Sequence, residues 1–245
     1  MRGNRKVSVG LGIATIVVLG IGAAIQLGLV GGSEPTEAAF ASPSAPGPPG
    51  TATDGTTTET TSTDGTWVID SESGSLDDAT STYAGYRIEE ELGGVGANTA
   101  VGRTQEVSGQ LVIDGTRITE LSVEVDMTTL RSDDDRRDGQ LAERGLETSA
   151  FPTATFVLSE PIELDQEPAE GKVVEIDAIG DLTLHGVTRS VTVPIQAKRS
   201  GDVIEAVASV DVALADYDID PPTGFLVLSI AETGTVELHL LFVPA

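Results

Sequence analysis

The chain has 245 residues, which is enough for one or two domains. Its 39 Asp and Glu residues outnumber 14 Lys and Arg residues, and the net charge of −25 would repel the phosphate backbone of a nucleic acid. No cysteine occurs, so disulfides, zinc–thiolate sites, iron–sulfur clusters, thiol nucleophiles and cysteine-linked lipid anchors are excluded. The composition therefore argues against nucleic-acid binding and rules out every cysteine-dependent function.

The N-terminal region has the pattern of a membrane anchor. Val7 to Val30 is a run of 24 residues without a charge, and a helix of that length would reach about 36 Å, enough to cross a bilayer. Residues 1–6 include three basic side chains, and no other basic residue occurs before Arg87. The positive-inside rule then places residues 1–6 in the cytoplasm and everything after Val30 outside it.

A cleaved signal peptide is the alternative to an uncleaved anchor. Ala39-Phe40-Ala41 has the small-x-small form of a cleavage site. However, this site lies well beyond the apolar run, and acidic residues and a proline separate the two. We therefore expect a single-pass cell-membrane protein with its C-terminal domain outside the cytoplasm, or a secreted protein if the segment is cleaved.

Residues 31–66 are predicted to be a disordered linker. Of these 36 residues, 25 are Gly, Pro, Ser or Thr, and such a stretch has too few apolar side chains to fold. A flexible chain of this length spans roughly 30–36 Å. The linker would hold a domain formed by residues 67–245 away from the membrane.

Residues 67–245 show the period-2 alternation of β-strands. Leu121, Val123 and Val125 alternate with polar residues, and the same pattern recurs to the end of the chain. Three turn signals separate the runs: Asp114-Gly115, Ser200-Gly201-Asp202 and Thr233-Gly234. We expect strands near residues 67–70, 83–92, 105–114, 116–127, 153–163, 172–184, 187–199, 202–214 and 234–243. A helix is expected over residues 133–145, with Ser132 as its N-cap and Leu141 facing inward.

This pattern predicts an all-β domain, either a sandwich or a closed antiparallel barrel with one or two short helices. Closure into a barrel removes the exposed sheet edges that promote aggregation. About eight strands would leave an interior able to hold one small ligand. The alternative is an interior filled completely by its own apolar side chains.

Several stretches resemble functional motifs but do not match them. The acids of residues 133–138 and 216–220 alternate like those of a calcium loop, yet the required Gly and the distant Glu are missing from both. Residues 93–96 read as a β-hairpin loop rather than a phosphate-binding loop. His239 lies in the outward phase of a strand, and His185 lies at a hairpin corner where it would make a structural hydrogen bond. We expect no metal site and no catalytic residue.

Two motifs resemble those of the YceI-like family. Residues 180–189, GDLTLHGVTR, resemble its hairpin motif G-x-L-T-L-H-G-V-T-[RK]. Arg137-Asp138, Leu141 and residues 151–156, FPTATF, resemble its RD-x-x-L and F-P-x-A-x-F block. Val107-Ser108-Gly109, followed by Asp114-Gly115, also fits its early hairpin. The resemblance spans roughly residues 67–242.

The resemblance implies a lipocalin-like barrel with a helix beside it and an apolar lumen that holds a polyisoprenoid or another long amphiphile. It also implies that Arg137, Asp138 and His185 fix the fold, as an ion pair or helix–barrel latch and as a turn. Strand phase and motif position together select the residues expected to face the ligand: Tyr86, Ile88, Val123, Val125, Met127, Phe151, Phe156, Leu182, Leu184, Val191, Val193, Val210, Val212, Leu238, Leu240 and Phe242.

The sequence therefore favours a membrane-tethered, extracytoplasmic lipid-binding protein that performs no chemistry. Its partners would be the membrane and an isoprenoid lipid or quinone, with no other cofactor and no nucleic acid. Two other hypotheses stay open: a structural or adhesion ectodomain with a filled core, and a secreted hydrolase or isomerase. The acidic surface also raises the hypothesis of adaptation to high salt, where carboxylates keep a protein soluble.

Overall fold

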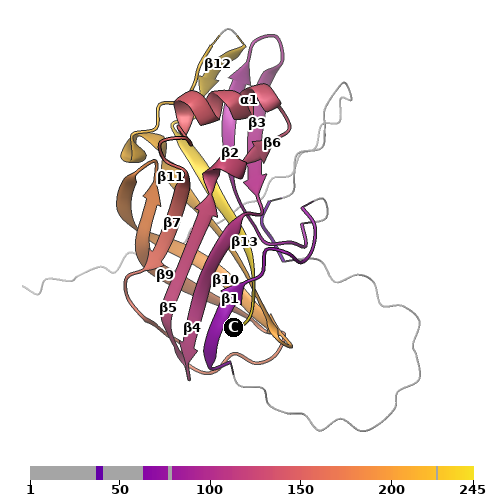
Figure 1. Ribbon diagram of the computed structural model, residues 1–245, viewed down its shortest axis with the longest axis vertical. Coiled ribbons are helices and arrows are strands. Elements are labelled where there is room, and N and C mark those ends of the chain that lie inside the picture. The colour runs from indigo at the N-terminus through magenta and orange to yellow at the C-terminus, as the bar shows by residue number, and fades with distance from the viewer. Residues whose placement is uncertain (1–36, 41–62, 77–78, 225) are drawn as a thin grey trace, which may run out of the picture. The chain divides into compact units, whose positions relative to one another are not determined.

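The computed structural model describes residues 37–40, 63–76, 79–224 and 226–245, and the folded part is an antiparallel β-barrel (Figure 1). Eight strands form a closed ring, because the first strand pairs with both the second and the last strand of the ring. In ring order they are β1 (Gly65–Ile69), β4 (Val107–Asp114), β5 (Arg117–Asp126), β7 (Thr153–Leu158), β9 (Val173–Leu184), β10 (Val187–Ser200), β11 (Val203–Ala213) and β13 (Thr233–Pro244).

Four additional strands extend one end of this ring, and a fifth, short strand lies at the other end. The C-terminal end of β13 pairs with β1, where Phe242 lies opposite Ile69. The preceding part of β13 pairs with an additional strand, where His239 lies opposite Tyr83. Where β1 ends, the additional strand takes its place beside β13, and the barrel is longer at that end. The additional strands are β2 (Tyr83–Leu92), β3 (Gly96–Thr104), β6 (Arg131–Ser132) and β12 (Val227–Ile230), and β8 (Ile162–Glu163) pairs with β5 at the other end.

Alternation along each strand builds the interior. In β5, Leu121, Val123 and Val125 are buried, whereas the residues between them face outward. Val123 lies opposite Phe156 of β7, which lies opposite Leu182 of β9, so inward residues of neighbouring strands meet side by side. Removing these apolar side chains from water stabilises the barrel by about 25 cal/mol per Å².

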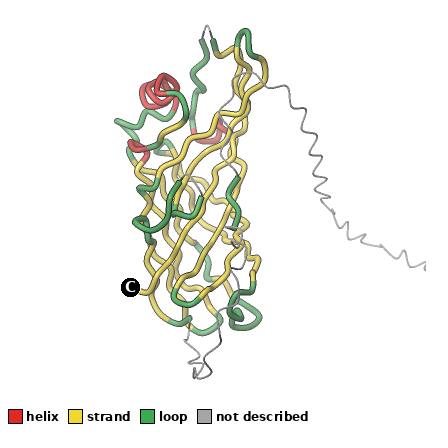
Figure 2. Tube along the Cα trace, turned by 90° about the vertical axis from the view of Figure 1, so that its right-hand side faces the viewer, coloured by secondary structure: helices red, strands yellow, loops and turns green. Residues whose placement is uncertain are grey.

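The helical segments gather at the extended end of the barrel (Figure 2). Helix α1 (Asp135–Gln140) continues into a π-helical turn, η2 (Leu141–Gly145), and the short 3₁₀ helices η1 (Met127–Thr129) and η3 (Leu214–Tyr217) lie nearby. The N-cap of α1 is Asp134, whose carboxylate accepts a hydrogen bond from the Arg136 N–H, and not Ser132 as predicted. Ser132 lies two residues before the cap position, where its hydroxyl donates to Asp138 and accepts from the Asp134 N–H.

The sequence prediction missed three strands and misplaced one turn. The shortest of the three, β6, has only two residues and pairs with β3. Strands β3 and β12 lack a regular apolar alternation, and both are held by pairing with β2. Thr233-Gly234, predicted as a turn, belongs to β13, because the two residues pair with Ala213 and Val212 of β11. The predicted strand over residues 153–163 is broken into β7 and β8 around Pro161.

The folded domain begins before the predicted boundary at Trp67. Strand β1 starts at Gly65, and Thr63 is buried, with its carbonyl oxygen accepting a hydrogen bond from the Trp67 indole at 2.9 Å. The predicted anchor at residues 7–30 lies outside the described residues, as does most of the linker. None of the helices in the described part of the chain has the length and apolar content needed to span a bilayer.

Candidate functional site

The barrel encloses two adjoining cavities with apolar walls. The lower cavity, of about 110 Å³, lies between β4, β5, β9, β10, β11 and β13. The upper cavity, of about 400 Å³, lies beside α1, β2 and β12. The two cavities adjoin, and we call them together the lumen. Five side chains contribute to the walls of both: Val123, Phe156, Leu182, Val236 and Leu238.

The upper cavity reaches solvent at the end where α1 lies, and we call this end the mouth. Arg136 of α1 and Val95 of the β2–β3 turn both line the cavity and are largely exposed. One side of the mouth is thus the charged helix α1, and the other is an apolar turn. A long ligand with a polar head would fit this arrangement, with its tail in the lumen and its head at the mouth.

Phe156 of β7 lies at the junction of the two cavities, because the neighbouring strand β9 has a glycine, and so no side chain, beside its ring. A Cβ atom at Gly180 of β9 would lie 2.5 Å from Cζ of the Phe156 ring. The ring therefore fills space that any other residue at position 180 would occupy. Val191 of β10 lies opposite Gly180, on the same stretch of wall.

The structure places 14 of the 16 predicted lumen residues on the cavity walls. That they contact a ligand stays a prediction. Six line only the upper cavity, four line only the lower one, and the other four line both. The 14 are Tyr86, Ile88, Val123, Val125, Met127, Phe156, Leu182, Leu184, Val193, Val210, Val212, Leu238, Leu240 and Phe242.

Phe151 and Val191 line neither cavity. Phe151 precedes β7 and lies in the opposite phase to Ala154 and Phe156, so its ring packs on His185, with the ring centroids 4.3 Å apart. Val191 has the inward phase and packs against the core, but the Phe156 ring fills the space beside its neighbour Gly180.

The prediction also omitted lumen residues that the same signal could have found. Leu111 and Ile113 of β4, Leu121 of β5 and Ala206 of β11 share the alternation phase of predicted residues and line the lower cavity. By contrast, Leu130, Pro221 and Pro222 reach the upper cavity from loops, where no periodic signal exists.

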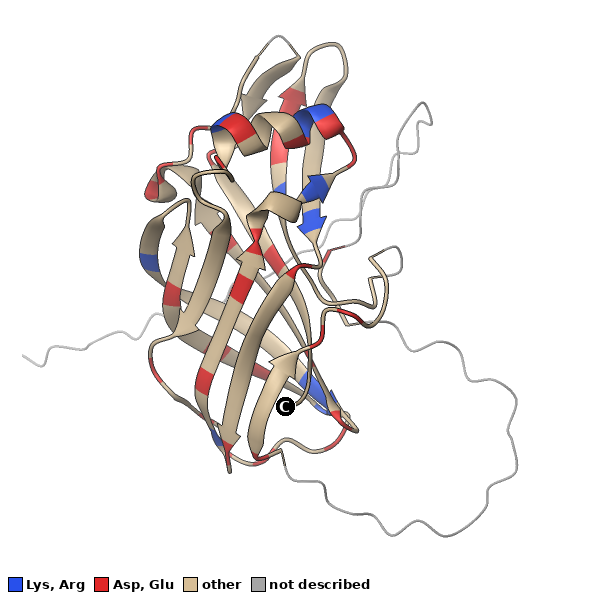
Figure 3. Ribbon diagram, viewed as in Figure 1, with Lys and Arg blue, Asp and Glu red and all other residues tan. Residues whose placement is uncertain are grey.

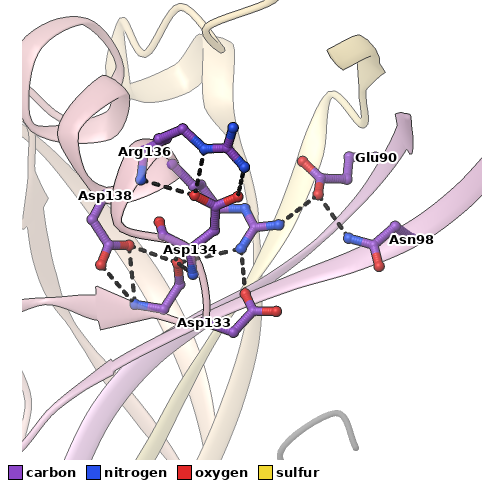
Figure 4. Close-up of polar contacts among 8 residues, drawn as sticks. Glu90, Asn98, Asp133, Asp134, Arg136 and Asp138 are labelled. Carbon is purple, nitrogen blue, oxygen red and sulfur yellow. Dashed lines mark hydrogen bonds and ion pairs between the residues drawn. The ribbon is translucent and has the colours of Figure 1, made fainter. Parts of the chain in front are cut away.

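A polar cluster attaches α1 to the barrel at the mouth (Figure 4). Arg137 Nη2 of α1 lies 2.9 Å from Glu90 Oε1 of β2, and Asn98 of β3 donates to the same oxygen at 2.7 Å. Arg137 also pairs with Asp133. Burial alone would lower the pKa of Arg137, but the hydrogen bond to Asp133 and the charge of Glu90 outweigh it and raise that pKa.

Asp138 has a different role from Arg137. Its carboxylate accepts hydrogen bonds from the Ser132 backbone N–H at 3.0 Å and from the Ser132 hydroxyl at 2.6 Å. It thereby fixes β6 to the start of the helix. The two adjacent motif residues therefore hold α1 in place from two sides, one against β2 and one against β6.

Tyr86 of β2 lines the upper cavity. Its hydroxyl is buried and has no hydrogen-bond partner among the described residues. Burial raises the pKa of Tyr86, so the hydroxyl keeps its proton and can donate it in a hydrogen bond. A ligand head that offers an oxygen acceptor would satisfy it.

The two histidines lie outside the cavity walls. His185 has a left-handed backbone, with a φ angle of 51°, and its ring nitrogens lie 3.1 Å from the Tyr217 carbonyl oxygen and from Glu147. His239 points away from the lumen but is only 1% exposed, because Ser81 and Glu205 contact its ring nitrogens. Across the described ranges, no cluster of three or more His, Asp or Glu side chains has metal-binding geometry.

A buried ion network lies near His239 on the outward face of β13. Glu237 is 2% exposed, and its carboxylate contacts Arg87 at 3.0 Å and Arg103 at 3.2 Å. The Arg103 guanidinium also lies 4.3 Å from the centre of the Tyr83 ring. These groups join β13, β2 and β3, and Arg87 also lines the upper cavity.

Comparison with known proteins supports this picture of the domain. A family model described as the YceI-like domain matches residues 67–242. A solved structure of a polyisoprenoid binding domain from Saccharophagus degradans is 17% identical, with a TM-score of 0.53, and the match covers 67% of this chain and 98% of that one. BcnA from Burkholderia cenocepacia is 18% identical, with a TM-score of 0.50, and covers 65% and 95%. No curated protein matches the chain.

Proposed function

Because this chain belongs to the YceI-like family, we propose that its barrel holds a polyisoprenoid or a similar long amphiphile in the lumen, as a carrier or store and without chemistry. The observation that carries the proposal is the apolar lumen, formed by adjoining cavities of about 110 and 400 Å³. The relative from Saccharophagus degradans, described as a polyisoprenoid binding domain, supports the same ligand class.

The physical basis of binding is the transfer of an apolar tail out of water. Each buried methylene group contributes about 0.8 kcal/mol, so a tail of several isoprene units supplies enough free energy for tight binding. The empty volume argues against the alternative of an ectodomain with a filled core. Selectivity would come from the length of the lumen and from the few polar groups at the mouth, Tyr86 foremost.

The proposal includes an extracytoplasmic location and a membrane tether. Its support is the uncharged run from Val7 to Val30, with basic residues on one side only. Protease treatment of intact cells that carry an epitope tag at the C-terminus tests this part. Loss of the tag before lysis is expected, whereas protection of the tag until lysis would contradict it.

Native mass spectrometry of the full chain, followed by organic extraction, tests the ligand proposal. A bound mass of several hundred daltons that extracts as a prenyl lipid is expected. The variant Ala206→Phe, which places a ring in the lower cavity, should lose it, whereas Val157→Phe on the exposed face of β7 should keep it. An unoccupied wild-type protein that also fails to take up added prenol or prenyl quinone would overturn the proposal.

A further inference from the structure

Two uncharged stretches, far apart in the sequence, meet at the mouth. Residues 92–102 carry no charge between Glu91 and Arg103, and residues 221–231 carry none between Asp220 and Glu232, although 22% of the whole chain is charged. Leu92 of β2 pairs with Val227 of β12, and the Gly93 N–H donates to the Leu226 carbonyl oxygen at 2.7 Å. We call residues 92–97 and 226–230 the tip, and Figure 1 shows it projecting past α1.

The tip carries the most exposed large apolar side chains in the described part of the chain. Val95 is 78% exposed, Leu228 60% and Leu226 54%. Val157 and Val173, the next most exposed, lie on different strands. A group of apolar side chains presented together to water indicates an interaction surface, whereas single ones do not.

The apolar surface of the tip is continuous with the wall of the upper cavity. Leu92, Val95, Leu226 and Val227 line that cavity, so an apolar path leads from the tip into the lumen. Figure 3 shows that charged residues lie on α1 at the other side of the mouth, whereas the loops of the tip carry none. The mouth therefore has one side suited to water and one suited to hydrocarbon.

We propose that the tip inserts into the surface of a neutral, zwitterionic lipid bilayer, where the lumen exchanges its ligand with the membrane. The purpose of this contact rests on the proposed function, since a lipid ligand would then move between membrane and lumen without crossing water. Three exposed side chains are few compared with the 20–30 residues per side of a stable protein interface, which favours a bilayer over a protein partner.

The charges of the protein determine which kind of bilayer the tip can enter and how deeply it inserts. With a net charge of −25, the protein is repelled by anionic lipids, so a zwitterionic surface is the fitting partner. Glu89 and Glu91 of β2 are exposed just before the tip and would stop insertion there. The contact is therefore shallow and reversible, as repeated exchange of a ligand requires.

Site-specific fluorescence tests the insertion. The chain has no cysteine, so Val95→Cys, Leu228→Cys and the control Val173→Cys, at the start of β9, each accept one environment-sensitive dye. In the full chain reconstituted into phosphatidylcholine vesicles, doxyl-labelled lipids should quench the dye at 95 and 228 at least fivefold more than at 173. Equal quenching at all three positions, or none at 95 and 228, would overturn the proposal.

A second copy of the chain is the competing occupant, and the same labels detect it. If the dye at 95 shifts to shorter wavelength with increasing protein concentration in detergent, without vesicles, the tip binds another copy and the bilayer proposal is wrong. No dependence on protein concentration is expected.

A transfer assay separates docking from ligand binding. Leu228 does not line the cavity, so Leu228→Asp should slow transfer of a prenyl quinone from vesicles at least fivefold and leave its uptake from detergent micelles unchanged. Val173→Asp should change neither. If Leu228→Asp slows transfer from vesicles and uptake from micelles equally, the proposal that the tip docks on a bilayer is wrong. If the wild type takes up no quinone from vesicles or from micelles, the proposed function is wrong. The quenching experiment still tests insertion of the tip, because it does not depend on ligand uptake.

Discussion

Phe156 of β7 and Gly180 of β9 together divide the lumen: the Phe156 ring occupies the position that a side chain at residue 180 would need. This pair lies where the two cavities meet. We therefore expect this glycine and this aromatic ring to limit how far a long ligand can extend from the mouth.

Truncation of Phe156 should therefore change ligand length. Phe156→Ala joins the two cavities more widely, and the extracted prenyl lipids should shift to chains longer by at least one isoprene unit, as mass spectrometry will show. Loss of a buried aromatic costs about 3–5 kcal/mol of stability, so Phe156→Leu provides a milder second variant. Val157→Ala on the outer face is the control. An unchanged length distribution in both Phe156 variants would contradict this role.

Gly180→Ala should destabilise the barrel. The added methyl group would lie 2.5 Å from the Phe156 ring and from the Val157 carbonyl oxygen, and such overpacking costs about 1–3 kcal/mol. Gly139→Ala in α1 is the matched control, because its methyl group meets no atom and alanine favours a helix by up to about 1 kcal/mol. Urea unfolding measures both, and equal stability of the two variants would be inconsistent with the packing.

Tyr86→Phe should have opposite effects on ligand affinity and on stability. If the hydroxyl donates to the ligand head, its loss weakens binding by about 0.5–1.5 kcal/mol, or roughly two- to tenfold. The free protein should be as stable as the wild type or slightly more so, because an unpartnered buried hydroxyl is removed. Tyr217→Phe removes another such hydroxyl outside both cavities and should leave affinity unchanged. Ligand titration and thermal unfolding distinguish the two.

Glu237→Gln should be among the most damaging conservative changes. It removes the carboxylate that two arginines share in a buried site, and loss of one partner from a buried ion pair costs about 3–5 kcal/mol. Glu163→Gln breaks the exposed pair with Arg117 and should cost less than about 1 kcal/mol. Denaturant midpoints will show the contrast, and similar losses for both would argue against a buried network.

Acid should loosen the start of α1. Hydrogen bonds from the Arg136 side chain and backbone lower the pKa of Asp134, so the ionised carboxylate is favoured in the folded state. Its contribution is therefore present above the ordinary Asp pKa of about 3.9 and is lost as the pH falls through the lower folded value. The effect is small, because the side chain is 37% exposed.

Amide exchange measures this change. Protection of the Arg136 N–H, which donates to Asp134 at 2.8 Å, should fall as the pH is lowered from 5 to 3, after correction for the intrinsic rate. In Asp134→Asn, which retains a capping oxygen without the ionisable group, the protection should not vary with pH. The same decrease in both proteins would mean that another group controls the helix.

Local sequence patterns predicted most of the barrel wall. Inward residues such as Val123 and Leu238 follow from strict alternation, because successive side chains of a strand point to opposite faces. The same reasoning failed at Phe151, which lies before its strand begins, and at β3, where glycines interrupt the pattern. Thr233-Gly234 shows a further limit, since a turn signal can lie inside a strand when a neighbouring strand, here β11, pairs with it.

Other features depend on residues that are distant in the sequence. The ion pair of Arg137 with Glu90, the sharing of Glu237 by two arginines and the meeting of residues 92–97 with residues 226–230 join separate elements. Each requires a specific sheet register, and register is a property of paired strands rather than of one segment.

The sequence by itself determined the all-β class, the family motifs and the inward phase of most strands, because these depend on local spacing and side-chain type. Only the tertiary structure decided that the ring closes through β13, that Phe156 divides the lumen and that the apolar tip stands at its mouth. Closure, cavity volume and surface exposure result from how distant strands pack against one another. No single segment carries that information.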